Sequence, residues 1–269
     1  MLQIGCQTYT WEMLGDGWSG DADDLVAAIA RAGYAGIEIT DRMIGAYAGR
    51  PEAFGKLLAA HGLDLVAFAC ASDSGYTEPA LKAADLVMID RALDFVAAFP
   101  GATLSLGSAT IMSPGARESK FDAAADLYNA AGELGRRAGV PVAVHPSSHH
   151  DTLLFSGADY DALFARLDPD LVRWVPDTGH ILRGGMDILD TLATYRDRIR
   201  YLHLKDVDAA GCWRMLGAGL CDVRAVVDAV AAAPNFNGWL VLEEESDDAA
   251  ADPAAAVLTN RETLRALAA

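Results

Sequence analysis

Four residues whose side chains commonly bind metal ions stand at the ends of four successive apolar segments. The segments PVAVH, VRWVPD, YLHL and WLVLE contain His145, Asp177, His203 and Glu243. Each separation, roughly 25 to 40 residues, is long enough for one strand and one helix. Neighbouring parallel strands lie about 4.8 Å apart, so side chains at four adjacent strand ends can meet at one ion. The spacing therefore predicts a metal site, provided that the segments are adjacent strands.

Short apolar segments alternate along the whole chain with longer, Ala-rich segments of helical period. Expected helices include 21–32, 51–61, 79–99 and 120–138. Expected strands lie at 2–7, 35–39, 63–69, 102–106, 141–145, 172–176, 199–204 and 239–243. Eight strand-helix units in 269 residues predict an α/β fold, a (β/α)8 TIM barrel forming a single domain over residues 1–269. A doubly wound open sheet is the alternative, and its ligands would also bind at the carboxyl ends of the strands.

Side-chain alternation predicts which of the candidate residues point into the barrel. In YLHLK the two leucines pack outward against the helices, so His203 points inward. Glu243 shares a face with Val241, and Glu245 lies one pleat further along the same face. Glu244 is expected to turn toward the helix layer and solvent. Glu243 is therefore the carboxylate expected to point into the barrel. Glu245 is expected either to support the metal ligands without binding the metal or to contact the substrate.

Composition limits the partners that such a site could have. The formal net charge of -17 and the pI of about 4.6 would repel a nucleic-acid backbone. The 4 cysteines are scattered without a CxxC pair, which favours reduced thiols and a cytoplasmic location. No apolar run approaches the roughly 18 residues of a membrane span, and no export signal follows the first residue. We therefore expect neither a nucleic-acid nor a membrane partner, while a homo-oligomer is compatible with the sequence.

Five longer motifs resemble the xylose-isomerase-like sugar isomerase and epimerase barrels, a family with inosose dehydratases, ketose epimerases and apurinic-site endonucleases. The motifs span most of the chain: GYAGIEIT at 33–40, DTGH at 177–180, YLHLKD at 201–206, LGAGLCD at 216–222 and GWLVLEEE at 238–245. The resemblance implies a divalent metal cofactor, commonly Mn, Co, Zn or Mg. It also implies that Asp177, His203 and Glu243 bind this metal, and that His180 contacts the substrate.

At the position of the fourth metal ligand, this chain differs from the family that it resembles. Ketose epimerases of this family have a glutamate at the end of the fifth strand, where this chain has His145. His149, His150 and Asp151 follow in the same loop and could take its place. We prefer His145 because it ends the apolar run.

The resemblance implies chemistry on a keto sugar or keto-polyol. A divalent ion held by two carboxylates and two imidazoles would stabilise the enediolate formed when a proton leaves next to the carbonyl. Glu243 is the expected base, and Glu245 is its alternative. Isomerisation or epimerisation is the first interpretation. Elimination of water by a dehydratase, with an acid such as His145, His180 or His149, stands beside it.

Six further residues are candidates for substrate binding. Glu38 ends the second strand and could touch substrate or be a buried structural acid, and His149 follows the fifth strand. Trp11 could stack on a sugar, as could Trp213. Arg183 and Arg214 could hold hydroxyl groups or a phosphate.

Two alternatives to a sugar-converting enzyme are also compatible with this fold. An apurinic-site endonuclease would need a basic groove and ligands for several metals, and the acidic composition argues against it. A noncatalytic barrel that binds a polyol without a metal is the other alternative.

Overall fold

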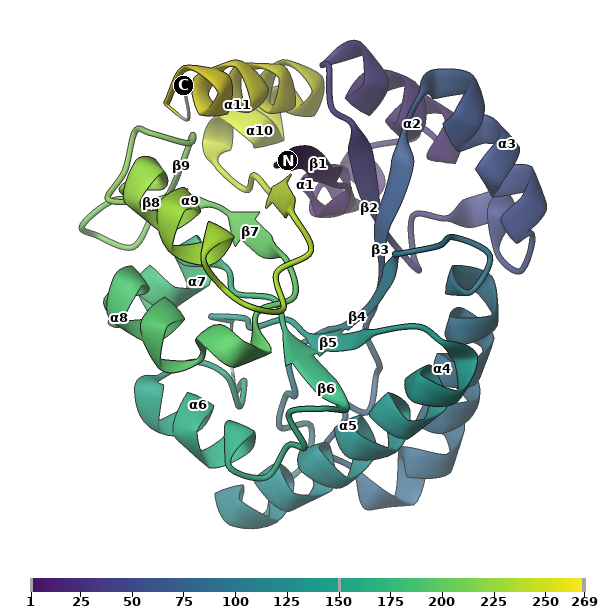
Figure 1. Ribbon diagram of the computed structural model, residues 1–269, viewed down its shortest axis with the longest axis vertical. Coiled ribbons are helices and arrows are strands. Elements are labelled where there is room, and N and C mark those ends of the chain that lie inside the picture. The colour runs from purple at the N-terminus through teal and green to yellow at the C-terminus, as the bar shows by residue number, and fades with distance from the viewer. Residues whose placement is uncertain (1, 150, 268–269) are drawn as a thin grey trace.

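Eight parallel strands form the centre of the computed structural model, which describes residues 2–149 and 151–267 (Figure 1). The sheet order is β6-β5-β4-β3-β2-β1-β10-β7. The strands are β1 (Gln3–Gln7), β2 (Gly36–Thr40), β3 (Asp64–Cys70), β4 (Thr103–Leu106), β5 (Val142–Val144), β6 (Val172–Trp174), β7 (Leu202–Leu204) and β10 (Trp239–Leu242). All eight predicted strands are confirmed, most of them shortened at one end.

The two ends of this sheet meet, so the sheet is a closed barrel. The backbone nitrogen of Arg200 donates to the carbonyl of Trp174 at 2.8 Å, and that of His203 donates to Pro176 at 2.8 Å. These bonds join β6 to β7 in parallel. The doubly wound open sheet is therefore wrong, and the TIM barrel is confirmed.

Helices surround the barrel as an outer ring (Figure 1). The main ones are α2 (Ala22–Arg31), α3 (Pro51–His61), α4 (Lys82–Val96), α5 (Arg117–Ala138), α6 (Gly157–Phe164), α7 (Thr178–Arg183), α8 (Ile188–Thr194), α9 (Val223–Ala231) and α11 (Pro253–Leu267). Asp21 begins α2 with a capping box. Left-handed glycines end α3 and α5. Short helices α1 (Tyr9–Glu12) and α10 (Asp247–Ala251) lie in loops.

Alternation along the strands divides the hydrophobic core into two layers. Leu202 and Leu204 pack in the large core between barrel and helices. Tyr201 and Val241 belong to a separate small cluster inside the barrel. His203 and Glu243 continue this inward series, as the parity of the sequence predicts.

The position of Glu244 agrees only in part with the prediction from the sequence. It does turn into the helix layer, but it is only 2% exposed. Its Oε2 accepts a hydrogen bond from Asn260 Nδ2 at 2.6 Å, and Asn260 lies on α11. A solvent-facing position is therefore wrong, because a residue of the last helix satisfies this carboxylate.

A hairpin of β8 (Asp206–Val207) and β9 (Trp213–Arg214) follows β7. The carboxylate of Asp206 organises the loop after it by accepting hydrogen bonds from the backbone nitrogens of Gly217, Gly219 and Cys221 at 2.9–3.0 Å. Asp206 therefore does not pair with its neighbour Lys205.

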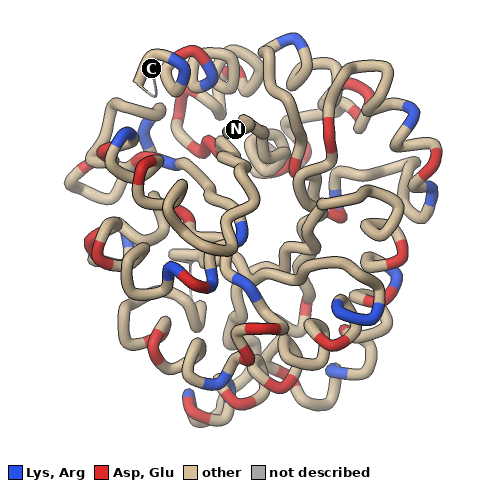
Figure 2. The backbone as a smooth tube through the Cα atoms, viewed as in Figure 1, with Lys and Arg blue, Asp and Glu red and all other residues tan. Residues whose placement is uncertain are grey.

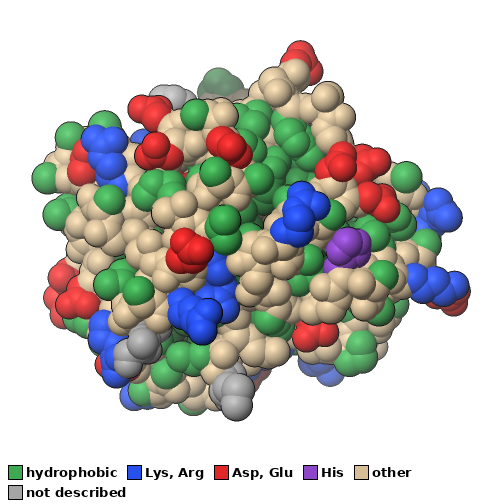
Figure 3. Space-filling model, turned by 90° about the horizontal axis from the view of Figure 1, so that it is seen from above, with side chains coloured by type: hydrophobic (Ala, Val, Ile, Leu, Met, Phe, Trp, Pro, Cys, Tyr) green, Lys and Arg blue, Asp and Glu red, His purple; other side chains and the backbone are tan. Residues whose placement is uncertain are grey.

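Charged residues of both signs are spread along the backbone around the ring of helices (Figure 2). On the side of the molecule seen in Figure 3, Asp and Glu side chains lie between the Lys and Arg side chains. None of the helices in the described ranges is long and apolar enough to cross a bilayer.

Candidate metal centre

The four predicted metal ligands lie together at the carboxyl end of the barrel. His145 directly follows β5, Asp177 precedes α7, His203 is the middle residue of β7, and Glu243 directly follows β10. One side-chain nitrogen or oxygen from each residue lies within 4.8 Å of those of the other three. Three of the side chains are buried, and His145 is half-buried. The barrel thus brings together residues from distant parts of the chain.

The distances between these atoms are those of one compact polar cluster. His203 Nδ1 lies 3.0 Å from His145 Nε2 and 2.8 Å from Glu243 Oε2. Asp177 Oδ2 lies 3.6 Å from His145 Nε2. It is buried and has no hydrogen-bond partner among the described residues. An unpartnered carboxylate oxygen is costly in a buried position, and a cation beside it would remove that cost.

The other carboxylate oxygen of Asp177 already accepts a hydrogen bond within the protein. Asp177 Oδ1 accepts a hydrogen bond from the backbone nitrogen of His180 at 2.8 Å, which begins α7. Burial raises the pKa of Asp177, but its interactions with His180, with the ammonium of Lys205 and with the ring of His145 outweigh this effect and hold the pKa below its usual range. The carboxylate is therefore ionised and fixed, with one oxygen directed at the cluster. Two carboxylates and two imidazoles, one oxygen still unpartnered, fit a divalent ion such as Zn, Mn or Co.

Glu38 orients one of the imidazoles. Its Oε2 lies 2.7 Å from His203 Nε2, and both side chains are 1% exposed. This contact turns His203 Nδ1 toward the other three residues of the cluster. Burial lowers the pKa of His203, but Glu38 and Glu243 outweigh this effect and raise it to about 10. Glu38 therefore acts in the manner of a carboxylate behind a metal-binding histidine.

Lys205 connects the two inward glutamates, a role that was not predicted. Its Nζ donates to Glu243 Oε1 at 2.7 Å and also contacts Glu245 Oε1. The ammonium lies 4.4 Å from the ring centroid of Trp213, in a cation-π contact. Lys205 is only 1% exposed. It neutralises part of the acidic charge at the site without being a metal ligand, since it has no lone pair when charged.

Glu245 and His180 are the titratable groups with unusual pKa values beside the cluster. Burial, opposed by Lys205 and reinforced by Glu243, raises the pKa of Glu245 to about 7. Burial lowers the pKa of His180 well below its usual range, so its imidazole is neutral. His180 Nδ1 accepts from the backbone nitrogen of Ser148 at 3.1 Å, which places the ring proton on Nε2. A carboxylate that titrates near neutrality and a neutral imidazole donor are suitable for proton transfer.

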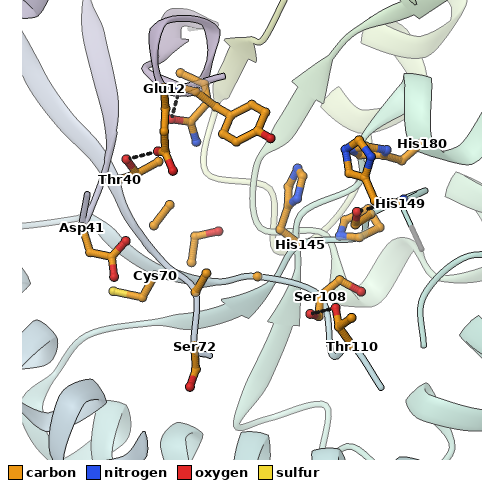
Figure 4. Close-up of a pocket in the computed structure, with 18 of the residues that line it drawn as sticks. Glu12, Thr40, Asp41, Cys70, Ser72, Ser108, Thr110, His145, His149 and His180 are labelled. Atoms are coloured by element: carbon orange, nitrogen blue, oxygen red, sulfur yellow. Dashed lines mark hydrogen bonds between the residues drawn. The ribbon is translucent and has the colours of Figure 1, made fainter. Parts of the chain in front are cut away.

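A cavity of about 330 Å³ opens beside these residues, within the range of small-ligand pockets. In Figure 4, His145, His149 and His180 stand across this space from Glu12, Thr40 and Asp41. Hydroxyl and amide side chains supply further hydrogen-bonding groups: Gln7, Tyr9, Ser72, Ser105, Ser108 and Thr110. No lysine or arginine lines the cavity within the described ranges.

The remaining substrate candidates divide into two groups. Glu38, His149, His180 and Glu245 line the cavity. Trp11 does not, because it is 3% exposed and packs in the hydrophobic core. A sugar-stacking role for Trp11 is therefore wrong. Of the alternative fourth ligands, His149 and Asp151 are not in the cluster, and His150 lies outside the described residues.

Neither candidate arginine reaches the cavity. The guanidinium of Arg183 stacks 4.5 Å from the ring centroid of Trp213. Arg214 pairs with Asp208 at 2.6 Å on the exposed hairpin. Trp213 itself contacts Lys205 and His180 and also does not line the cavity. The structure therefore does not place either arginine at the cavity, and each has a partner elsewhere.

Comparison with known proteins identifies relatives of this barrel. The family model of the xylose isomerase-like TIM barrel matches residues 26–267. An inosose dehydratase of Geobacillus thermodenitrificans is 31% identical over 166 residues, which cover 55% of this chain and 55% of that protein. The alignment thus spans about half the length of the curated relatives.

Solved structures share the fold over almost the whole chain. The IOLI protein with a bound zinc atom has a TM-score of 0.81 and 13% identity, covering 99% of this chain and 98% of that one. The 3-keto-D-glucoside 4-epimerase YcjR from E. coli has a TM-score of 0.77 and 19% identity, covering 99% and 100%. At these identities the likeness establishes the fold.

Proposed function

Because the chain belongs to the xylose isomerase-like TIM barrel family, we propose that it is a divalent-metal-dependent enzyme acting on a keto sugar or keto-polyol. Its first step would be removal of a proton next to the substrate carbonyl. Isomerisation or epimerisation and elimination of water can both follow from this step.

The unpartnered oxygen of Asp177 carries the proposal. It is buried among His145, His203 and Glu243, at the edge of a cavity rich in hydroxyl groups. These four side chains would hold the ion, with Zn, Mn, Co and Mg as the candidate metals. When bound, such an ion polarises a carbonyl and stabilises negative charge that develops on oxygen.

The protein's own residues would supply proton transfer. Glu245 lines the cavity and has a pKa raised to about 7, so it is ionised in part near neutral pH and can accept a proton. Glu243 is the alternative base, but Lys205 and His203 occupy both of its oxygens. His180 presents its Nε2 proton and could donate a hydrogen bond to a leaving oxygen.

The cavity favours an uncharged substrate. Its described lining contains the acidic side chains of Glu12 and Asp41 and no lysine or arginine. Away from the proposed ion, a phosphate or carboxylate group would meet repulsion from these acids without a compensating lysine or arginine in the described lining. Hydroxyl and amide groups can instead pair with the hydroxyl groups of a free sugar or cyclitol.

Dehydration is the second candidate, and two observations favour it. The curated relatives with about 30% identity are named inosose dehydratases. His145 also stands where ketose epimerases would have a second glutamate, so the site lacks a matched pair of carboxylate bases. A single base with a separate acid suits elimination of water.

The test uses protein stripped with chelator and reloaded with Mn, Zn or Co. Proton NMR in D₂O would follow exchange of the proton next to the carbonyl in free ketoses and inososes. We expect metal-dependent exchange that Glu243→Gln abolishes, and that Glu133→Gln, on α5 and outside the cavity, leaves unchanged. A rearranged sugar would identify an isomerase or epimerase, and loss of water a dehydratase. Exchange in metal-free protein, or equal activity in Glu243→Gln, would contradict the proposal.

A further inference from the structure

A group of arginines lies at the amino end of the barrel, opposite the metal centre. Arg173 is the middle residue of β6, Arg198 ends the short helix η4 (Arg196–Arg198), and Arg200 precedes β7. All three are half-buried. Blue segments of β6 and of the chain before β7 lie near the centre of the barrel in Figure 2. In a chain with 38 acidic and 21 basic residues, such a local excess of positive charge calls for an explanation.

Backbone carbonyls and one hydroxyl group are the partners of these arginines. Arg198 Nη2 donates to the carbonyls of Phe164 and Leu167, each at 2.8 Å. Arg200 donates from Nε to Thr103 Oγ1 and from Nη2 to Gly101, both at 3.2 Å. Within residues 2–149 and 151–267, none of the three arginines forms an ion pair with a carboxylate. Their charges are therefore hydrogen-bonded in part but not neutralised.

Arg173 has the most unused hydrogen-bonding capacity. In the described chain its guanidinium makes one hydrogen bond, from Nη1 to the carbonyl of Asp197 at 3.3 Å. A guanidinium has five N-H groups, so most of its donors remain available. Burial lowers the pKa of Arg200, and the charge of Arg173 lowers it further. The two cations therefore destabilise each other unless an anion lies between them.

A cavity is present at these arginines. It measures about 310 Å³ and is lined by Arg173, Arg200, Asn235 and the segment 139–142 that leads into β5. Arg136 also lines it but is paired with Glu133 at 2.6 Å, and Asp170 is the single acidic residue in the described lining. Gly132 and Gly135 on α5 also line it, and their lack of side chains lets α5 pack closely against Leu171 and Val142. The volume is sufficient for a small oxyanion or for one carrying a sugar.

Asn237 is an independent sign that an acceptor is missing from this end of the barrel. Its Nδ2 is buried without a hydrogen-bond partner among the described residues. Its backbone nitrogen donates to the carbonyl of Arg200 at 2.8 Å, and both residues line a second, adjoining cavity. Buried donors of this kind normally have an acceptor. Asn237 lines this second cavity and is not among the described residues that line the cavity of Arg173, so it adds an unpaired donor beside the arginines.

We propose that Arg173 and Arg200 form a binding site for a phosphate group at the amino end of the barrel, separate from the metal centre. Guanidinium groups match the oxygens of phosphate in geometry as well as in charge. The phosphate could be inorganic phosphate or part of a phosphorylated metabolite. Either would be a ligand of a site that the proposed reaction does not use.

The experiment is calorimetric titration of the full chain with sodium phosphate and, separately, with glucose 6-phosphate at constant ionic strength set by sodium chloride. We expect saturable binding to the wild type that weakens at least tenfold in Arg173→Gln. Arg200→Lys, which keeps the charge but loses the planar fork, should also weaken it. The matched control is Arg224→Gln, because Arg224 is exposed and pairs only with Asp228. The tighter of the two ligands identifies the source of the phosphate group.

Thermal unfolding supplies a second readout that does not depend on the heat signal. Without phosphate, Arg173→Gln should melt at a higher temperature than the wild type, because the repulsion is removed. With phosphate, the wild type should gain in melting temperature while Arg173→Gln does not. Equal response to phosphate and chloride, or binding by Arg173→Gln within twofold of the wild type, would overturn the proposal.

Discussion

The imidazole of His203 lies between two carboxylates, with Nε2 at 2.7 Å from Glu38 Oε2 and Nδ1 at 2.8 Å from Glu243 Oε2. Glu38 comes from β2 and Glu243 follows β10, so strands on either side of β1 fix the orientation of this ring. When the proton remains on Nε2, the lone pair of Nδ1 points to Asp177 and His145. Glu38 therefore sets which nitrogen can bind a metal.

Glu38→Gln tests this orientation. The amide keeps the size of the side chain but weakens the contact with His203 Nε2, so we expect metal affinity to fall about 10- to 100-fold. Competition titration with a chromogenic chelator and Zn would measure it. Glu12→Gln is the matched control, because Glu12 lines the same cavity and does not contact the cluster. Equal losses in both variants would show that charge in the cavity, and not orientation of His203, sets the affinity.

Removal of the Lys205 ammonium should destabilise the fold. The Lys205 side chain is only 1% exposed and pairs with both Glu243 and Glu245. In Lys205→Met these two glutamates stay close together in a buried position without the cation that they share. Breaking a buried pair in this way costs about 3–5 kcal/mol in the free energy of unfolding. Urea unfolding at pH 7 of the metal-free protein would measure the loss. The loss should shrink at lower pH, where the glutamates can take up protons.

The control for Lys205 is Lys82→Met, since Lys82 pairs with the exposed Asp126. We expect at most about 1 kcal/mol there. A similar small loss for Lys205→Met would mean that water or rearrangement solvates the two glutamates.

The sequence predicts those site residues that lie on strands. Successive side chains of a strand point to opposite faces of the sheet, so the sequence alone places His203 and Glu243 inside the barrel. The same parity would have found Lys205, which is two residues after His203. Its contact with Glu245 is not apparent from the sequence, because the two residues are 40 positions apart and meet only where β7 and β10 lie side by side.

The far wall of the cavity could not be predicted in this way. Glu12 and Asp41 lie in the loops after β1 and β2, whose conformation depends on contacts between loops. Thr40 joins them by donating to Glu12 Oε2 at 2.5 Å. Loops have no hydrophobic period that would reveal which side chains face a ligand.

Asp41 should make stability depend on pH. Burial, reinforced by the charge of Glu12, raises the pKa of Asp41 from 3.8 to about 6. The folded state therefore binds more protons than the unfolded state between these pH values, and this contribution to stability is lost as the pH rises through about 6. Asp41→Asn removes the titration. Relative to wild type, the variant should gain stability on going from pH 4 to pH 7.

Urea unfolding at several pH values would measure this difference. Asp90→Asn is the control, because Asp90 is exposed on α4. An Asp41→Asn difference that stays constant with pH, as in the control, would show that Asp41 titrates alike in the folded and unfolded states.

Glu243 and Glu245 should separate into a metal ligand and a base. Glu243 Oε2 faces His203 Nδ1 in the cluster, whereas Glu245 lines the cavity, contacts Lys205 and is not one of the four clustered residues. We expect Glu245→Gln to lower kcat about 10²- to 10⁴-fold while metal affinity stays within a few-fold of wild type. Glu243→Gln should lower metal affinity and activity together. Steady-state kinetics and metal titration on the same preparations would decide, because the reverse pattern would make Glu243 the base and Glu245 a support for the metal.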